Sequence, residues 1–238
     1  MSMRLDFKNP RSVMEFLQKP TLQIAEALTG ILCSDSKDWK LSAGHIVQAI
    51  IRGDLLTQLG QEIKTYQDTG KIKRDIFETD FNRASLKEII GFIDSETPDG
   101  VRFRAMKSVF LGSLETTADE VLTYELMKIC RQLSSMEIMI LSANYNVVKG
   151  TAKPTAKGIE WGAAIRIEYW AQIIAEQIGH NLPEIVLQYE EHLIALKLIS
   201  DRHYPIDRTR VTENFEKTQY FRLTSLGYKL CEFITKYD

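Results

Sequence analysis

The sequence lacks a charge imbalance, a cysteine framework and a long hydrophobic run, and each absence excludes a class of protein. Its 238 residues hold 30 Lys and Arg against 32 Asp and Glu, a balance that argues against a strongly basic nucleic-acid binder. Three scattered cysteines are neither a disulfide scaffold nor a metal knuckle and fit a reducing compartment. No stretch approaches the roughly 18–20 apolar residues of a transmembrane helix. We therefore expect a cytoplasmic protein that does not insert into a membrane.

The composition that is present is that of an ordinary globular protein. Hydrophobic residues make up 44% of the chain, enough to bury a real core. The charge is balanced within each half as well, because residues 1–133 and residues 134–238 each carry a net charge of −1. Neither half is an obvious electrostatic partner for DNA or for an anionic membrane.

The first 133 residues have the apolar spacing of helices. One apolar stretch covers 12–33 and is divided by Pro20, and a longer amphipathic helix is expected over 41–66. That helix contains three glycines, which favour close helix packing over a hinge. They are Gly44, Gly53 and Gly60.

Capping signals divide the next part of the chain into shorter helices. A hydroxyl residue followed three positions later by Glu can cap a helix reciprocally. Three such boxes are Ser85-x-x-Glu88, Thr117-x-x-Glu120 and Ser134-x-x-Glu137. They predict helices over 86–93, 121–133 and 136–145. A further helix is predicted at Thr97-Pro98-Asp99, with Thr97 as the cap and Pro98 as the first helical residue.

A flexible loop is predicted over 149–158, where KGTAKPTAKG has no apolar periodicity. Its lysines, Lys149, Lys153 and Lys157, either contact phosphate or keep the loop soluble. A helix is then predicted over 159–178, ending at a left-handed Gly179, and another over 183–199. The remaining pattern predicts a strand, a polar loop, a second strand over 220–223 and a final helix capped by Thr224 or Ser225.

A helix-turn-helix followed by two strands is the order of a winged helix. We therefore predict a mainly α fold, with an N-terminal helical domain (1–133) and a C-terminal winged-helix domain (134–238) containing a small β-hairpin. The segments Ala175–Gly179, Leu193–Ile199 and Leu223–Gly227 resemble the corresponding segments of bacterial repressors of the multiple-antibiotic-resistance type. That resemblance implies the fold, whereas winged helices serve both DNA and protein partners.

A second resemblance covers more of the chain. The helical N-terminal region, the Pro-Asp helix start, the QLSSMEIMIL segment and the winged-helix-like tail are similar to the bacterial abortive-infection alpha family. This similarity implies an association with phage defence. It assigns no functional residue.

DNA binding is one interpretation of the C-terminal pattern. It would use Gln188 and His192 on helix 183–199 to read bases. Phosphate contacts would come from Arg202, Arg208, Arg210, Lys217, Lys149, Lys153 and Lys157. Against this, helix 183–199 carries Glu184, Glu190 and Glu191 with one lysine, and residues 200–222 have a net charge of only +1. We therefore favour contacts with a protein partner or in a homodimer, with DNA binding as the alternative.

No catalytic constellation is recognisable. HExxH, CxxC, GxSxG and Walker patterns are absent, and the four histidines, His45, His180, His192 and His203, form no set. Asp94, Glu96 and Asp99 are explained better by capping and solvation than by a cation. The hypothesis is a non-enzymatic bacterial regulatory or phage-defence-associated protein that needs no cofactor or metal.

Overall fold

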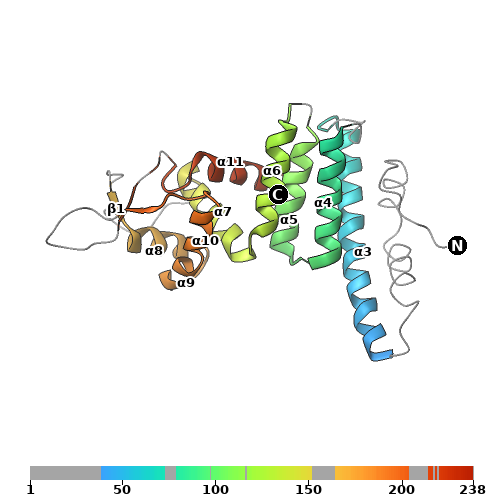
Figure 1. Cartoon of the computed structure of the whole chain (residues 1–238), viewed down its shortest axis with the longest axis horizontal. Coiled ribbons are helices and arrows are strands. Elements are labelled where there is room, and N and C mark those ends of the chain that lie inside the picture. The colour runs from blue at the N-terminus through green and yellow to red at the C-terminus, as the bar shows by residue number, and fades with distance from the viewer. Residues whose placement is uncertain are drawn as a thin grey trace. The chain divides into compact units, whose positions relative to one another are not determined.

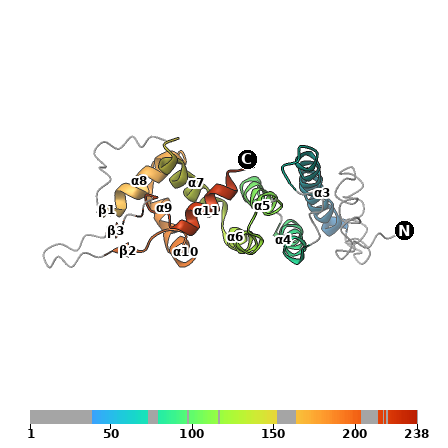
Figure 2. The same cartoon turned by 90° about the horizontal axis from the view of Figure 1, so that it is seen from above.

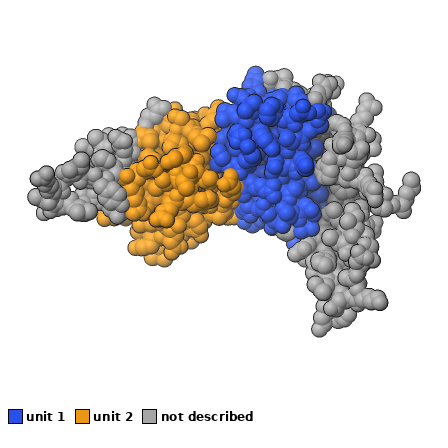
Figure 3. All heavy atoms as spheres, in the orientation of Figure 1, with its two compact units in different colours: residues 1–131, 237 blue, residues 132–236, 238 orange. Residues whose placement is uncertain are grey.

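The computed structural model describes residues 39–72, 79–96, 98–115, 117–151, 164–203, 214–216, 218 and 220–237. The chain forms two compact units, which Figure 3 draws in blue and orange. Unit 1 comprises residues 1–131 with Tyr237, and unit 2 comprises residues 132–236 with Asp238. The described residues are mostly helical, which confirms the prediction of a mainly α fold. The helices predicted within 12–33 lie outside the described residues.

Unit 1 contains helices that lie side by side (Figures 1 and 2). Their bounds are α3 Trp39–Asp68, α4 Asp80–Glu96, α5 Gly100–Ser113 and α6 Glu120–Gln132. Fully buried apolar side chains fill the space between them, including Leu59, Ile63, Phe92, Phe110 and Leu126. The helix predicted over 41–66 is confirmed as α3, and its glycines Gly53 and Gly60 are buried.

Helix starts in unit 1 differ from the sequence prediction. Ser85 is a buried residue inside α4, and Thr79 caps that helix by accepting the N–H of Asn82 at 3.2 Å. The amphipathic pattern simply extends one and a half turns further back than the Ser85 box. Asp99 caps α5 in place of Thr97, and the N–H of Leu122 donates to Asp119 rather than to Thr117 at the start of α6. At both starts an aspartate is available two residues further along, and a carboxylate caps as well as a hydroxyl.

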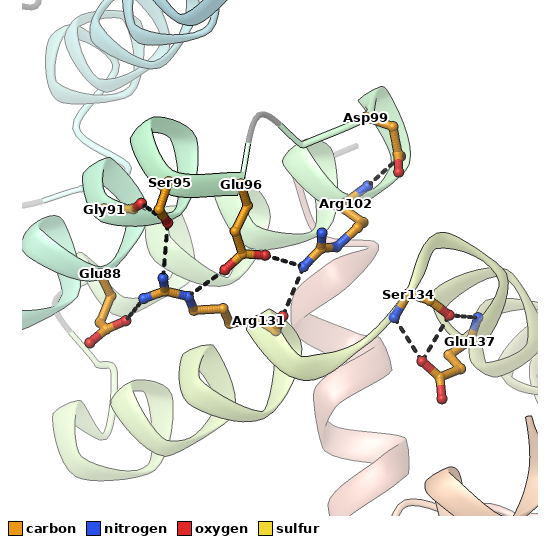
Figure 4. A network of polar contacts seen from close by, with 9 residues as sticks. All are labelled: Glu88, Gly91, Ser95, Glu96, Asp99, Arg102, Arg131, Ser134 and Glu137. Carbon is orange, nitrogen blue, oxygen red and sulfur yellow. Dashed lines mark hydrogen bonds and ion pairs between the residues drawn. The ribbon is translucent and has the colours of Figure 1, made fainter.

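A network of ion pairs and hydrogen bonds connects helices α4, α5 and α6 (Figure 4). Arg131 donates to Glu88 at 2.7 Å and to Glu96 at 2.9 Å. Arg102 donates to Glu96 at 2.6 Å and to the backbone oxygen of Arg131 at 3.0 Å. The C-terminal end of α4, which carries Glu96, is therefore held by two guanidinium groups.

The same network predicts acid sensitivity. Burial alone would raise the pKa of the Glu96 carboxyl, but the hydrogen bonds and charges of Arg131 and Arg102 lower it overall. A folded-state pKa below the unfolded value gives stability that is present above the carboxyl range and is lost as the pH falls below about 4. Glu96→Gln should therefore flatten the fall of the urea midpoint between about pH 5 and 3. Glu125→Gln, at an exposed carboxylate, should leave the slope unchanged, and an equal effect of both variants would contradict this account.

Unit 2 combines helices with a small sheet. Its elements are α7 Ser135–Lys149, β1 Ala164–Arg166, α8 Ile167–Gln177, α9 Pro183–Gln188, α10 Glu190–Ala195, β2 Arg202–His203, β3 Asn214–Glu216 and α11 Ser225–Ile234. The strands form an antiparallel sheet in the order β1-β3-β2, with Phe215 opposite both Ile165 and Arg202. The capping box at Ser134 is confirmed, since Ser134 Oγ accepts from the N–H of Glu137 and the Glu137 carboxylate accepts from the N–H of Ser134 (Figure 4).

Two predicted helices of unit 2 are wrong in extent. Residues 164–166, predicted as part of helix 159–178, are strand β1, and helix α8 starts only at Ile167. Gly179 has the expected left-handed conformation, with φ of +80°. The helix predicted over 183–199 is two short helices, because the N–H of Tyr189 bonds the oxygen of Val186 in a tight turn. This break starts α10 at Glu190.

The second predicted strand is also displaced. Strand β3 lies at 214–216, whereas 220, 221 and 223 form isolated bridges. Phe221 interrupts the extended run because its φ is +66°, a left-handed value that bulky residues rarely adopt. Thr224 then caps α11, accepting the N–H of Gly227 at 3.0 Å. The predicted final helix is confirmed, and of the two candidate caps it is Thr224 that caps it.

Candidate functional site

Only some of the candidate DNA contacts lie among the residues that the structure describes. Gln188, His192, Arg202 and Lys149 have described side chains. The others, Arg208, Arg210, Lys217, Lys153 and Lys157, lie outside the described residues. The four that are described all belong to unit 2.

Arg202 points its guanidinium group at a buried carboxylate. Its Nε and Nη2 atoms donate to Glu190 Oε2 at 3.0 and 2.5 Å. The Glu190 side chain has no exposed surface, and that of Arg202 is 28% exposed. Arg202 therefore neutralises a buried charge, and a phosphate would have to compete with that contact.

Arg222 is the third member of this arrangement. The sequence did not predict that it would pair with Glu190. Its side chain is fully buried and forms an ion pair with Glu190 Oε1. It donates to the backbone oxygen of Ser200 at 3.3 and 3.1 Å and lies over the Trp170 ring at 4.3 Å. Burial lowers the pKa of Arg222, and the charge of Glu190 opposes that shift. One signal was available in the sequence, since Arg222 stands between the apolar residues Phe221 and Leu223.

The side chain of Glu190 therefore holds two cations. Its burial follows helical spacing, since Glu190 comes four residues after the buried Val186 and three before the buried Leu193. The cluster of Glu190, Arg202 and Arg222 is called the Glu190 cluster below. It joins α10, β2 and the segment before α11.

His192 makes a second contact to a buried carboxylate. Its Nδ1 atom lies 2.5 Å from Glu137 Oε1, while the other carboxylate oxygen accepts the N–H and the hydroxyl of Ser134 at 2.7 and 2.8 Å. The His192 side chain is 45% exposed and that of Glu137 is 4% exposed. The buried Glu137 carboxylate thus orients the His192 imidazole, which remains partly exposed to solvent.

Lys149 contacts the protein's own aromatic rings. Its Nζ atom lies 5.4 Å from the ring centroids of both Tyr145 and Tyr228, and Tyr228 stacks on Tyr220 with centroids 4.1 Å apart. The hydrogen bond to Tyr228, followed by the influence of Tyr145, raises the pKa of Lys149. This lysine links the end of α7 to α11.

The solvent-facing side of α9 and α10 is acidic. Glu184, Gln188 and Glu191 are exposed there, and within the described residues neither glutamate has a hydrogen bond or ion pair. Leu182, just before α9, is 57% exposed. This surface, defined by Leu182, Glu184, Gln188 and Glu191, is called the α9–α10 face below.

Metal ligands and thiols are the remaining groups that could perform chemistry. No cluster of three or more His, Cys, Asp or Glu side chains that could hold a metal ion occurs among them. Burial raises the pKa of the Cys130 thiol to about 12, which leaves it protonated and unreactive at neutral pH. Cys231 is also buried, and its Sγ donates to the backbone oxygen of Leu141 at 3.5 Å.

Comparison with known proteins finds no relatives. No family model matches the chain, and neither the curated proteins nor the solved structures include a significant match. A search for helices able to cross a membrane, made over the described residues, finds none that is long and apolar enough.

Proposed function

We propose that this chain is a non-enzymatic regulatory protein that acts through protein–protein contacts of unit 2, a winged-helix domain. The order of elements supports this domain type. Helix α7, strand β1, helices α8 to α10 and strands β2 and β3 follow one another, and the sheet order β1-β3-β2 places β1 beside the last strand. The whole-chain similarity to the abortive-infection alpha family favours a role in bacterial regulation or phage defence.

The Glu190 cluster is the observation that carries the proposal. Arg202 and Arg222 follow the helix-turn-helix, where a DNA-binding relative would use cations for phosphate contacts. Here both guanidinium groups bind Glu190 inside the fold. The outer face of α9 and α10 then offers glutamates, which phosphate repels. Backbone contacts supply much of the affinity of DNA-binding proteins, so this domain is better suited to a protein.

An in vitro selection from random duplex DNA tests the proposal. The full chain is incubated with the pool at 150 mM salt, and bound molecules are amplified through repeated rounds. We expect no sequence to be enriched. Enrichment of a motif that binds the purified chain with nanomolar affinity would contradict the protein-contact function.

The DNA alternative rests on the half-exposed His192 and on Gln188, together with Arg208, Arg210 and Lys217 between and after the last two strands. It has its own discriminating variant, Arg208→Ala combined with Arg210→Ala. Under the alternative, this variant should weaken binding to a nonspecific duplex more than tenfold at low salt. Under the proposal, the affinity changes by less than threefold.

A further inference from the structure

Leu182 is conspicuous on the surface of unit 2 for two independent reasons. It is the most exposed large apolar side chain among the residues that the structure describes, at 57%. It also occupies the N-cap of α9, where its side chain forms no capping hydrogen bond. Ser, Thr, Asp or Asn is favoured at that position. Local folding therefore does not explain a leucine here, and departures from local rules concentrate at functional positions.

The stretch of sequence that contains Leu182 is predominantly acidic. Residues 167–200, from α8 to the end of the turn after α10, contain Glu168, Glu176, Glu184, Glu190 and Glu191 against the single Lys197. Glu168, Glu184 and Glu191 are exposed. Lys197 lies 3.8 Å from Asp201, which offsets its charge.

Among the described side chains, the cations closest in sequence to this face are directed at other carboxylates. Arg202 and Arg222 are bound to Glu190 inside the unit, and His192 is directed at Glu137. Glu184 and Glu191 are exposed and form no ion pair with another described residue. An acidic surface with an apolar side chain at its edge is complementary to a segment that carries both Lys or Arg and an apolar residue.

Resting on the protein-contact function proposed above, we infer that the α9–α10 face binds a basic segment of a protein partner. Lysine or arginine side chains of that segment pair with Glu184 and Glu191, and an apolar side chain covers Leu182. The opposite sign of charge assigns the partner's chemistry, and it separates this surface from one that binds nucleic acid.

Selection of peptides tests this inference with a defined probe. A phage library of random dodecapeptides is panned against the immobilised full chain, and enriched peptides are synthesised with a fluorophore for anisotropy titration. We expect enriched sequences to be rich in Lys or Arg, to contain a large apolar residue and to be poor in Asp and Glu. Their affinity should fall when salt is raised from 50 to 300 mM, since exposed pairs are screened.

Two variants locate the binding surface. Leu182→Ser removes the apolar side chain and installs a favoured cap, so it should keep the fold while lowering peptide affinity at least tenfold. Glu184→Lys combined with Glu191→Lys should lower it by a similar factor or more. The matched controls are Val121→Ser, at an apolar residue of unit 1 that is 55% exposed, and Asp54→Lys, at an exposed carboxylate of α3. Both should change the affinity by less than twofold, with thermal unfolding verifying every variant.

Other outcomes would overturn the inference in distinguishable ways. Enrichment of neutral or acidic peptides, binding insensitive to the face variants, or no enrichment at all would reject the basic partner and leave the protein-contact function standing. Concentration-dependent self-association that the same variants abolish would assign the face to a second copy of the chain. Nanomolar binding to a selected DNA sequence would reject the proposed function itself.

Discussion

Replacing Glu190 by glutamine is expected to lower the free energy of unfolding by about 3–5 kcal/mol. The substitution keeps the shape of the side chain but removes the negative charge that two guanidinium groups share. Arg222 is fully buried, so its charge would lose the carboxylate with which it is paired and keep the Ser200 carbonyl and the Trp170 ring as close partners. A urea titration followed by circular dichroism measures the loss.

The next residue is the matched control. Glu191 has the same side chain on the same helix but is exposed, and surface substitutions of this kind stay within about 0.5 kcal/mol. A Glu190→Gln variant as stable as Glu191→Gln would show that Arg202 and Arg222 do not depend on Glu190. The account of the Glu190 cluster would then be wrong.

Replacing Gly227 by alanine is expected to destabilise unit 2 by at least about 3 kcal/mol, in the range of severe core defects. A Cβ atom at this position would lie 2.0 Å from the carbonyl oxygen and 2.9 Å from the carbonyl carbon of Leu198. These are backbone atoms, and the oxygen also accepts the N–H of Thr224 at 3.1 Å. The chain cannot move aside without breaking the start of α11.

Gly91→Ala is the comparison for this variant. Gly91 lies inside α4, and a Cβ atom there would meet no other atom within 4 Å. Alanine is favoured over glycine in a helix by up to about 1 kcal/mol, so this variant should be equally stable or more stable. Differential scanning calorimetry of both variants gives the comparison. Equal effects would contradict the close contact between Gly227 and Leu198.

Local signals predicted the helices well where a single cap was available. Ser134 has no competing aspartate, and its capping box is confirmed. At the other helix starts Asp99, Asp119 and Thr79 act as caps in place of the predicted residues. Choice among neighbouring caps depends on how each helix packs against the rest of the unit, which spacing alone does not specify.

The Glu190 cluster could not be predicted because it depends on tertiary structure. Three glutamates follow Pro183 within eight residues, and periodicity over 183–199 treats them as parts of one helix. Of the three, Glu190 alone is buried, on the helix face that it shares with Val186 and Leu193, and the two arginines that pair with it come from later segments of the chain. Under the DNA-binding alternative, the sequence suggested Arg202 as a phosphate contact, whereas the fold brings it together with Arg222 on one carboxylate.

The salt dependence of DNA affinity is the most direct test of the central claim. That claim is that Arg202 and Arg222 of unit 2 pair with the buried Glu190 and that the outer side of α9 and α10 binds a protein. The full chain is titrated into a labelled duplex at several salt concentrations, and log K is plotted against log salt. Each neutralised phosphate adds about −0.9 to the slope. The account predicts weak binding with a slope no steeper than about −2, that is, about two phosphates neutralised. Nanomolar binding at 150 mM salt with a slope of about −5 or steeper would contradict it.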